Sequence, residues 1–108
     1  MKLLPTPLLN FYIENLDNIV NNQYNYPNKM VMLSGHNIDI AQMMTSLNIS
    51  SWQCIYDQWF KGSTDALNCY WRPYYASSLI LELFLDDLDQ KTYYVMIKYN
   101  GNYVKLCE

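Results

Sequence analysis

The feature that most constrains the fold of this chain is a short apolar run that leads directly into its only histidine. Residues 30–33 read Met-Val-Met-Leu, and they pass through Ser34 and Gly35 into His36 and a segment with helical periodicity. A strand that is apolar on both faces is typical of a parallel sheet with helices on both sides. Ligands of open α/β sheets bind outside the carboxyl ends of the strands. The sequence therefore predicts a buried strand over residues 30–33, with His36 in the position of a catalytic residue.

Three amphipathic segments predict helices around this strand. Residues 8–20 place apolar side chains at helical spacing. Residues 37–47 form a second segment, with Asn37 as its N-cap and Asp39 in its first turn, where a negative charge suits the helix dipole. A third, short helix is expected over residues 52–59, with Gly62 as its stop.

The C-terminal third predicts antiparallel strands instead. Residues 79–85 and 92–99 are apolar runs, and Asn100-Gly101 is a strong hairpin signal because both central positions of such a turn need positive φ. Residues 103–106 would form the return strand. The order helix, strand, helix, helix and then strands indicates an α/β fold with an antiparallel extension, within one domain of 108 residues.

Composition and charge argue against two classes of partner. Ten acidic and seven basic residues give a formal net charge of -3, and Lys and Arg are not clustered as they must be in a protein that binds phosphate backbones. We therefore predict no nucleic-acid partner. Apolar runs stay well below the roughly eighteen residues of a membrane-spanning helix. Pro5 and Pro7 interrupt the first apolar stretch, so we also expect no secretory signal.

The three cysteines leave two interpretations open. Cys54, Cys69 and Cys107 match no zinc pattern, and the single histidine is too distant to help, so we predict no metal site and no cofactor. They are either buried or free thiols, or Cys54 and Cys69 form a disulfide that closes the loop between them while Cys107 pairs outside the chain. Residues 48–50, Asn-Ile-Ser, are an N-glycosylation sequon that would agree with a secretory history, although such short motifs often arise by chance.

Three motifs, in order, resemble the histidine acid phosphatase family. Residues 29–38 read KMVMLSGHNI, which is similar to that family's K-x-x-x-x-S-[GA]-H-D-[TN]. Residues 73–83 read PYYASSLILEL, which is similar to its P-x-Y-A-S segment leading into a strand with Glu-Leu. Residues 94–101, followed by residues 106–107, resemble its closing hairpin and terminal cysteine. The resemblance covers nearly all of the chain from Phe11 onward.

This resemblance implies a partial phosphoglycerate-mutase-like fold and a two-step hydrolysis of phosphate monoesters. In the family, a histidine of an N-terminal R-H-G motif attacks phosphorus, and arginines hold the phosphate oxygens. A second histidine stabilises the transferring group, and the aspartic acid beside it protonates the leaving oxygen. His36 matches the second histidine. Asn37 stands at the position of the aspartic acid, and a carboxamide has no proton to give near neutral pH.

The rest of that machinery is not found in this sequence. His36 is the only histidine, so the R-H-G motif is missing, and the single arginine, Arg72, lies in the loop before Pro73. Without the nucleophile the covalent route is closed. We therefore expect residues 1–108 to be the C-terminal part of a histidine acid phosphatase-like domain that is inactive alone.

We expect another protein chain to complete the sheet, because a strand such as 30–33 needs neighbours on both sides. A phosphate ester would be bound only if the missing R-H-G half were supplied. The alternative is a non-catalytic interaction or structural subunit derived from the same fold. The family is commonly lysosomal or secreted, whereas the sequence itself leaves the compartment, the substrate and the oligomeric state open.

Several of these residues also have ordinary structural explanations. His36 could be a hydrogen-bonded residue at a strand end, and Asn37 could be no more than a helix cap. Asp39, two residues further along a helix, is expected to point away from His36, which argues against its acting as a replacement acid. Glu82 is expected to be a strand residue hydrogen-bonded at an edge or interface. Four methionines are expected to fill the core: Met30, Met32, Met43 and Met44.

Overall fold

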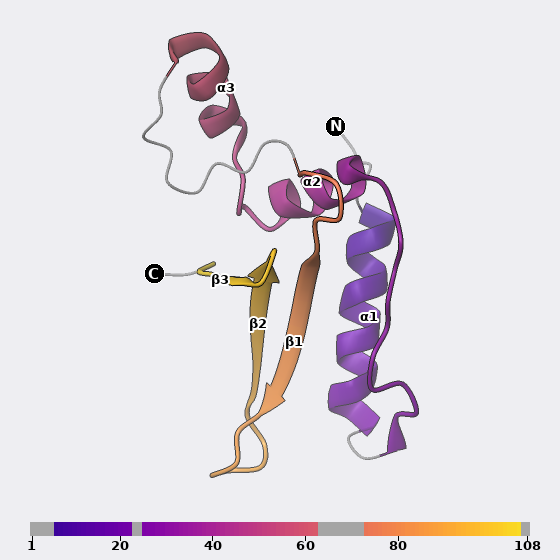
Figure 1. The fold of residues 1–108 in the computed structure, drawn as a ribbon. Helices are drawn as coiled ribbons and strands as arrows, with labels where there is room; N and C mark the ends of the chain where they lie inside the picture. The colour runs from indigo at the N-terminus through magenta and orange to yellow at the C-terminus, as the bar shows by residue number, and fades with distance from the viewer. Residues whose placement is uncertain (1–5, 23–24, 63–72, 107–108) are drawn as a thin grey trace.

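The computed structural model describes residues 6–22, 25–62 and 73–106, which form three helices followed by a three-stranded antiparallel sheet (Figure 1). The chain is therefore a mixed helix and strand protein, as the sequence predicts at this general level. The elements are α1 (Thr6–Asn22), α2 (Asn37–Ser46), α3 (Trp52–Lys61), β1 (Leu79–Leu85), β2 (Tyr93–Tyr99) and β3 (Asn102–Val104).

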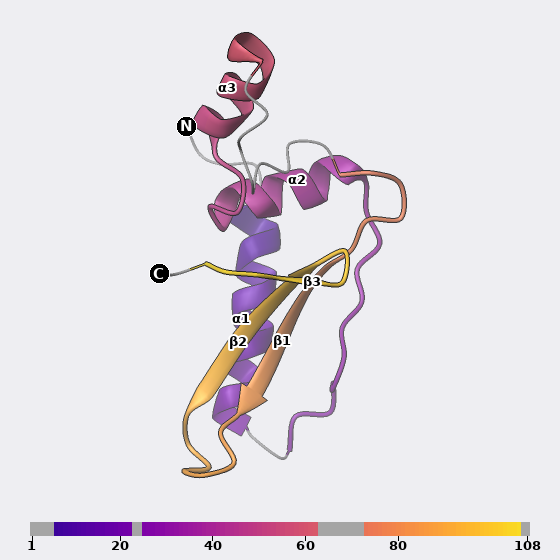
Figure 2. The same ribbon diagram turned by 60° about the vertical axis from the view of Figure 1, so that its left-hand side comes forward.

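The helices follow the predicted periodicity closely. α1 extends the predicted segment 8–20 by two residues at each end, and the hydroxyl of Tyr26 donates a hydrogen bond to Asn15 Oδ1 at 3.0 Å, which fastens the following chain to the helix. α3 ends at Gly62, whose φ of 61° is left-handed, as expected of a glycine that terminates a helix. Figures 1 and 2 show α1 running alongside the ribbon formed by β1 and β2, with α2 across one end of that ribbon.

The sheet is built from neighbours in sequence, in the order β1-β2-β3. Leu79 pairs with Tyr99 at one end of the β1–β2 ladder and Leu85 pairs with Tyr93 at the other. Asn100 and Gly101 both have positive φ, 49° and 84°, so β2 turns directly into β3. The predicted C-terminal strands 79–85 and 92–99 and the hairpin after them are confirmed, although β3 spans Asn102–Val104 and not the predicted segment 103–106.

The end of this sheet next to α2 forms a small core with residues of that helix and of the turn after it. Side chains on a strand alternate between faces, and in β2 the alternation buries Ile97 and Tyr99 while their neighbours remain partly or largely exposed. Met44, from the end of α2, and Ile49, from the turn after it, complete the buried cluster. Partly buried residues packed against the cluster are Ile40, Leu47, Leu79, Leu81 and Val104.

Residues 30–33 do not form the predicted strand. They run extended without a ladder, and their side chains are exposed: Met30 74%, Val31 43%, Met32 79% and Leu33 47%. Among the described residues, all strand pairing is antiparallel and involves residues 79–104 only. The strand prediction is therefore wrong for the chain as it stands, because the described residues offer segment 30–33 no neighbouring strand.

The four methionines expected in the core differ in burial. Met43 and Met44 are 2% and 0% exposed and fill the core as predicted, whereas Met30 and Met32 do not. The overall dimensions are also extended, with a radius of gyration of 15.8 Å and extents of 50 × 28 × 28 Å. A compact domain of about 100 residues has a radius of gyration of about 13 Å. The fold therefore leaves much of its apolar surface outside the core.

Candidate functional site

The predicted catalytic residues lie at the N-terminus of α2. His36 is the N-cap, with extended backbone angles of φ -94° and ψ 164°, and Asn37 is the first helical residue. The prediction that Asn37 is the N-cap is therefore wrong by one position. Both side chains are exposed. An imidazole and a carboxamide thus face solvent side by side at the start of a helix.

Asp39 secures this turn. The backbone N–H of His36 donates a hydrogen bond to Asp39 Oδ2 at 2.7 Å, and the backbone N–H of Asp39 donates to the carbonyl oxygen of His36 at 3.0 Å. The expectation that Asp39 points away from His36 is wrong, because an acidic residue at the third helical position reaches back to the N-cap amide. Its carboxylate is engaged with the backbone of His36 and caps the helix.

Gly35 makes the approach of this carboxylate possible. A Cβ at position 35 would lie 2.6 Å from Asp39 Oδ2, well inside van der Waals contact. Any residue larger than glycine would therefore displace the carboxylate from the His36 amide. The pattern Gly-His-x-x-Asp in the sequence has a local structural explanation, since it shapes the turn that presents His36.

Glu82 belongs to a second polar cluster, which spans the exposed face of the sheet. Lys98 Nζ lies 2.9 Å from Glu82 Oε1 and 4.6 Å from the ring centroid of Tyr103, and the Tyr103 hydroxyl donates to Glu82 Oε2 at 3.4 Å. Hydrogen bonding to Glu82, and then to Tyr103, raises the pKa of Lys98 above its usual value. The prediction that Glu82 is a hydrogen-bonded strand residue is confirmed.

Lys98 and Tyr103 carry no sequence signal of their own. The signal that could have placed them is the two-residue hairpin at Asn100-Gly101, because that turn sets Tyr103 opposite Lys98. Around this polar cluster, the same face of the sheet exposes five large apolar or aromatic side chains. They are Ile80 (44%), Phe84 (42%), Tyr94 (50%), Met96 (44%) and Tyr103 (60%).

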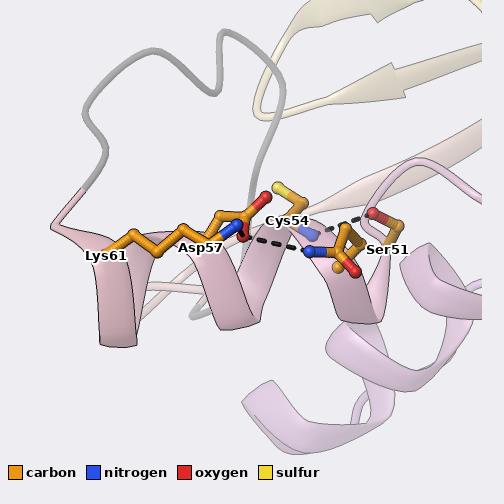
Figure 3. A network of polar contacts seen from close by, with 5 residues as sticks. Ser51, Cys54, Asp57 and Lys61 are labelled. Carbon is orange, nitrogen blue, oxygen red and sulfur yellow. Dashed lines mark hydrogen bonds and ion pairs between the residues drawn. The ribbon is translucent and has the colours of Figure 1, made fainter.

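The polar contacts of α3 surround the one cysteine that the structure describes (Figure 3). Ser51 Oγ accepts a hydrogen bond from the backbone N–H of Cys54 at 3.1 Å, and Lys61 Nζ lies 2.8 Å from Asp57 Oδ1. The lysine holds the pKa of Asp57 below its usual value. Cys54 is disulfide-bonded, which overturns the free-thiol interpretation for this residue. The predicted partner Cys69 lies outside the described residues.

Arg72 and Cys107 also lie outside the described residues. Within the described ranges, histidine, cysteine and carboxylate side chains form no cluster that could hold a metal ion. The described helices include none that is long and apolar enough to span a bilayer. The chain matches no protein-family model, no curated protein and no solved structure.

Proposed function

We propose that this chain is the C-terminal part of a histidine acid phosphatase-like domain, with a partial phosphoglycerate-mutase-like fold, that does not hydrolyse phosphate esters by itself. A second polypeptide would complete its sheet. The observation that carries the proposal is the exposure of segment 30–33 directly before His36. Four consecutive apolar side chains next to a well-formed turn are typical of a strand whose neighbours belong to another chain.

The backbone of segment 30–33 supports the same proposal. Among the described residues, no backbone group pairs with those of this segment. An extended stretch with free N–H and C=O groups is a template for strand addition, in which main-chain hydrogen bonds give affinity and alternate side chains give specificity. Met30 and Met32 are 74% and 79% exposed, and a partner strand on each side would bury them.

The chemistry of the completed site depends on what the partner brings. If the partner contains an R-H-G motif, its histidine would attack phosphorus, and His36 would donate a hydrogen bond to the transferring phosphoryl group. Asn37 could hydrogen-bond an oxygen but could not protonate the leaving group. Loss of general acid catalysis costs about 10²- to 10⁴-fold in rate. Restoring the acid with Asn37→Asp should recover a factor of this order in the assembled protein.

The isolated chain should not respond to the same change. Asn37→Asp alone should give no turnover of a simple aryl phosphate, because the nucleophile is still missing. Measurable turnover by the isolated variant that is abolished by His36→Ala would show that the chain needs no second half, and the proposal would be overturned.

The native mass of the species that carries this chain tests the completion of the sheet. Size exclusion with light scattering, followed by mass spectrometry of the components, should show a larger assembly. Met32→Lys should weaken that assembly, because it places a charge in the middle of the proposed strand contact. Leu88→Lys is a matched control, since Leu88 is 95% exposed in the turn between β1 and β2, away from segment 30–33. A folded monomer would contradict the proposal.

A non-catalytic interaction or structural subunit is the second candidate. It is favoured by Asn37, because even an assembled site would lack the family's acid, and by the exposed apolar face around Glu82 and Lys98. The two candidates differ in the partner. A partner with an R-H-G motif supports the split enzyme, and a stable partner without one supports the structural subunit.

A further inference from the structure

Ser50 carries a buried hydroxyl that folding does not explain. The residue is 2% exposed, and its Oγ has no hydrogen-bond partner within the described part of the chain. Burying a hydroxyl without a partner is destabilising, whereas an alanine methyl at the same place would carry no such penalty. The stability of the fold alone therefore favours alanine at position 50.

The neighbouring serine shows the contrast. Ser51 is the N-cap of α3, and its Oγ accepts a hydrogen bond from the backbone N–H of Cys54 at 3.1 Å. This is the usual role of serine before a helix. Of two adjacent serines, Ser51 is explained by the structure and Ser50 is not.

Asn48, two residues before Ser50, is exposed just after the end of α2. Its φ is 55°, a left-handed conformation that asparagine tolerates better than most residues, so the asparagine itself has a structural explanation. Ile49 between them is 6% exposed and belongs to the core. Asn48 is the only asparagine in the chain followed two positions later by serine or threonine.

We infer that Asn48 is an N-glycosylation site, and that Ser50 is present because the glycosyltransferase, not the fold, requires its hydroxyl. A lipid-linked oligosaccharide diphosphate would be the donor. The side-chain nitrogen of Asn48 forms a bond to the anomeric carbon of the sugar and gives one proton to a base of the transferase, while the bond from that carbon to the diphosphate oxygen breaks and its electron pair stays on the diphosphate. The lipid diphosphate leaves, and no oxidation or reduction takes place.

The geometry is compatible with this order of events. Ser50 and Ile49 are buried in the folded chain, so the transferase must recognise the sequon before this turn has folded. Once folded, the exposed Asn48 side chain carries its sugar outward while Ile49 packs into the core. The disulfide at Cys54 points independently to the same history, because disulfides form and persist in oxidising compartments such as the secretory pathway.

Mass spectrometry of the native protein tests whether Asn48 carries a sugar. Peptide-N-glycosidase treatment in water enriched with heavy oxygen leaves a labelled aspartic acid wherever a sugar was attached, and peptide mass spectrometry locates it. We expect the label at position 48 and a loss of mass of the intact chain. Recovery of the peptide around Asn48 in unmodified form only would overturn the inference.

Four variants of the full chain, directed to the secretory pathway of a eukaryotic host by a cleavable signal peptide, separate the sequon from the fold. Ser50→Ala and Asn48→Gly should both lose the glycosylated species; glycine is used because it accepts the left-handed backbone. Ser50→Thr should retain it. Ser51→Ala is the matched control and should also retain it.

The stability of the same variants tests the explanation of Ser50. In unglycosylated protein, Ser50→Ala should melt no lower than the unsubstituted chain, whereas Ser51→Ala should melt lower because α3 loses its cap. A sugar that persists in Ser50→Ala would contradict the assignment. A clear drop in the melting temperature of Ser50→Ala would show that the fold uses the hydroxyl, and the inference would lose its basis.

Discussion

The C-terminal strands and segment 30–33 all come from apolar runs of the sequence, yet only the C-terminal runs form a sheet in the described part of the chain. β1 and β2 are joined by a short turn and pair along their whole length, from Leu79 with Tyr99 to Leu85 with Tyr93. Closing so short a loop costs little conformational entropy. A parallel strand needs a crossover of a dozen or more residues to reach its neighbour. A hairpin therefore carries its own partner, whereas a segment such as 30–33 depends on strands that lie elsewhere.

Core truncation should show the largest difference between the two regions. Ile97 is 3% exposed in β2, so Ile97→Ala should lower the free energy of unfolding by about 2–5 kcal/mol. Met32 is 79% exposed, so Met32→Ala should change it by no more than about 0.5 kcal/mol. Chemical denaturation of each variant measures both values.

Ile97→Val keeps the comparison testable if Ile97→Ala fails to fold, since losing one methyl group costs about 0.5–1.5 kcal/mol. Equal losses from Met32→Ala and Ile97→Val would break the comparison. Such a result would mean that segment 30–33 packs against the rest of the isolated chain.

Much of the local structure could be predicted because local signals determine it. The spacing of apolar residues predicts α1. Gly62, with its left-handed backbone, ends α3, and Asn100-Gly101 predicts the turn into β3. The register of that turn also brings Lys98 opposite Tyr103. In each of these cases the interacting groups are close together in the sequence.

The errors have two physical causes. The apolar character of residues 30–33 predicts burial, but burial also needs a partner strand, which the described residues do not supply. Residue preference favours Asn37 as the cap of α2, but the Asp39 carboxylate accepts a hydrogen bond from the amide of His36, and the cap lies one position earlier. The same hydrogen bond explains why Asp39 reaches back to His36 and does not point away from it.

A change at Gly35, just after segment 30–33, should lower stability by an intermediate amount. It tests whether the turn that follows this segment is held by its own local contacts. Gly35→Ala places a methyl group where Asp39 Oδ2 now lies, so the carboxylate must leave the His36 amide. Loss of a helix cap costs about 0.5–2 kcal/mol. Hydrogen exchange should show faster opening of the first turn of α2, with the amides of β1 and β2 unaffected.

Asp39→Ala is the control for Gly35→Ala, because both remove the same bond. The double variant should be little worse than either single one, since residues that share one interaction are not additive. Fully additive losses would mean that Gly35 acts on α2 by some route other than the Asp39 carboxylate.

The smallest effect concerns the turn that lets β1 and β2 pair without outside help. Asp89 Oδ1 accepts hydrogen bonds from the backbone N–H groups of Lys91 and Thr92, both at 2.8 Å, and Asp89 Oδ2 accepts one from the Thr92 hydroxyl. The Thr92 hydroxyl and these backbone donors lower the pKa of Asp89 below its usual value. Its contribution to stability is therefore present above about pH 3.9, the value of an unfolded aspartic acid.

This contribution should disappear as the pH falls through the lowered pKa of Asp89, because protonation removes the charge that the three donors stabilise. Asp89→Asn should then destabilise the chain at pH 6 and make little difference in strong acid, so the gap between the two melting curves narrows with acidification. Asp87→Asn, in the same turn, is the control. The difference in melting temperature between Asp87→Asn and the unsubstituted chain should not narrow with acidification, because Asp87 accepts from Gln90 through its backbone carbonyl. A gap that stays constant down to pH 2 would mean that the turn holds β1 against β2 by its backbone alone, and that the self-sufficiency of this hairpin owes nothing to the Asp89 charge.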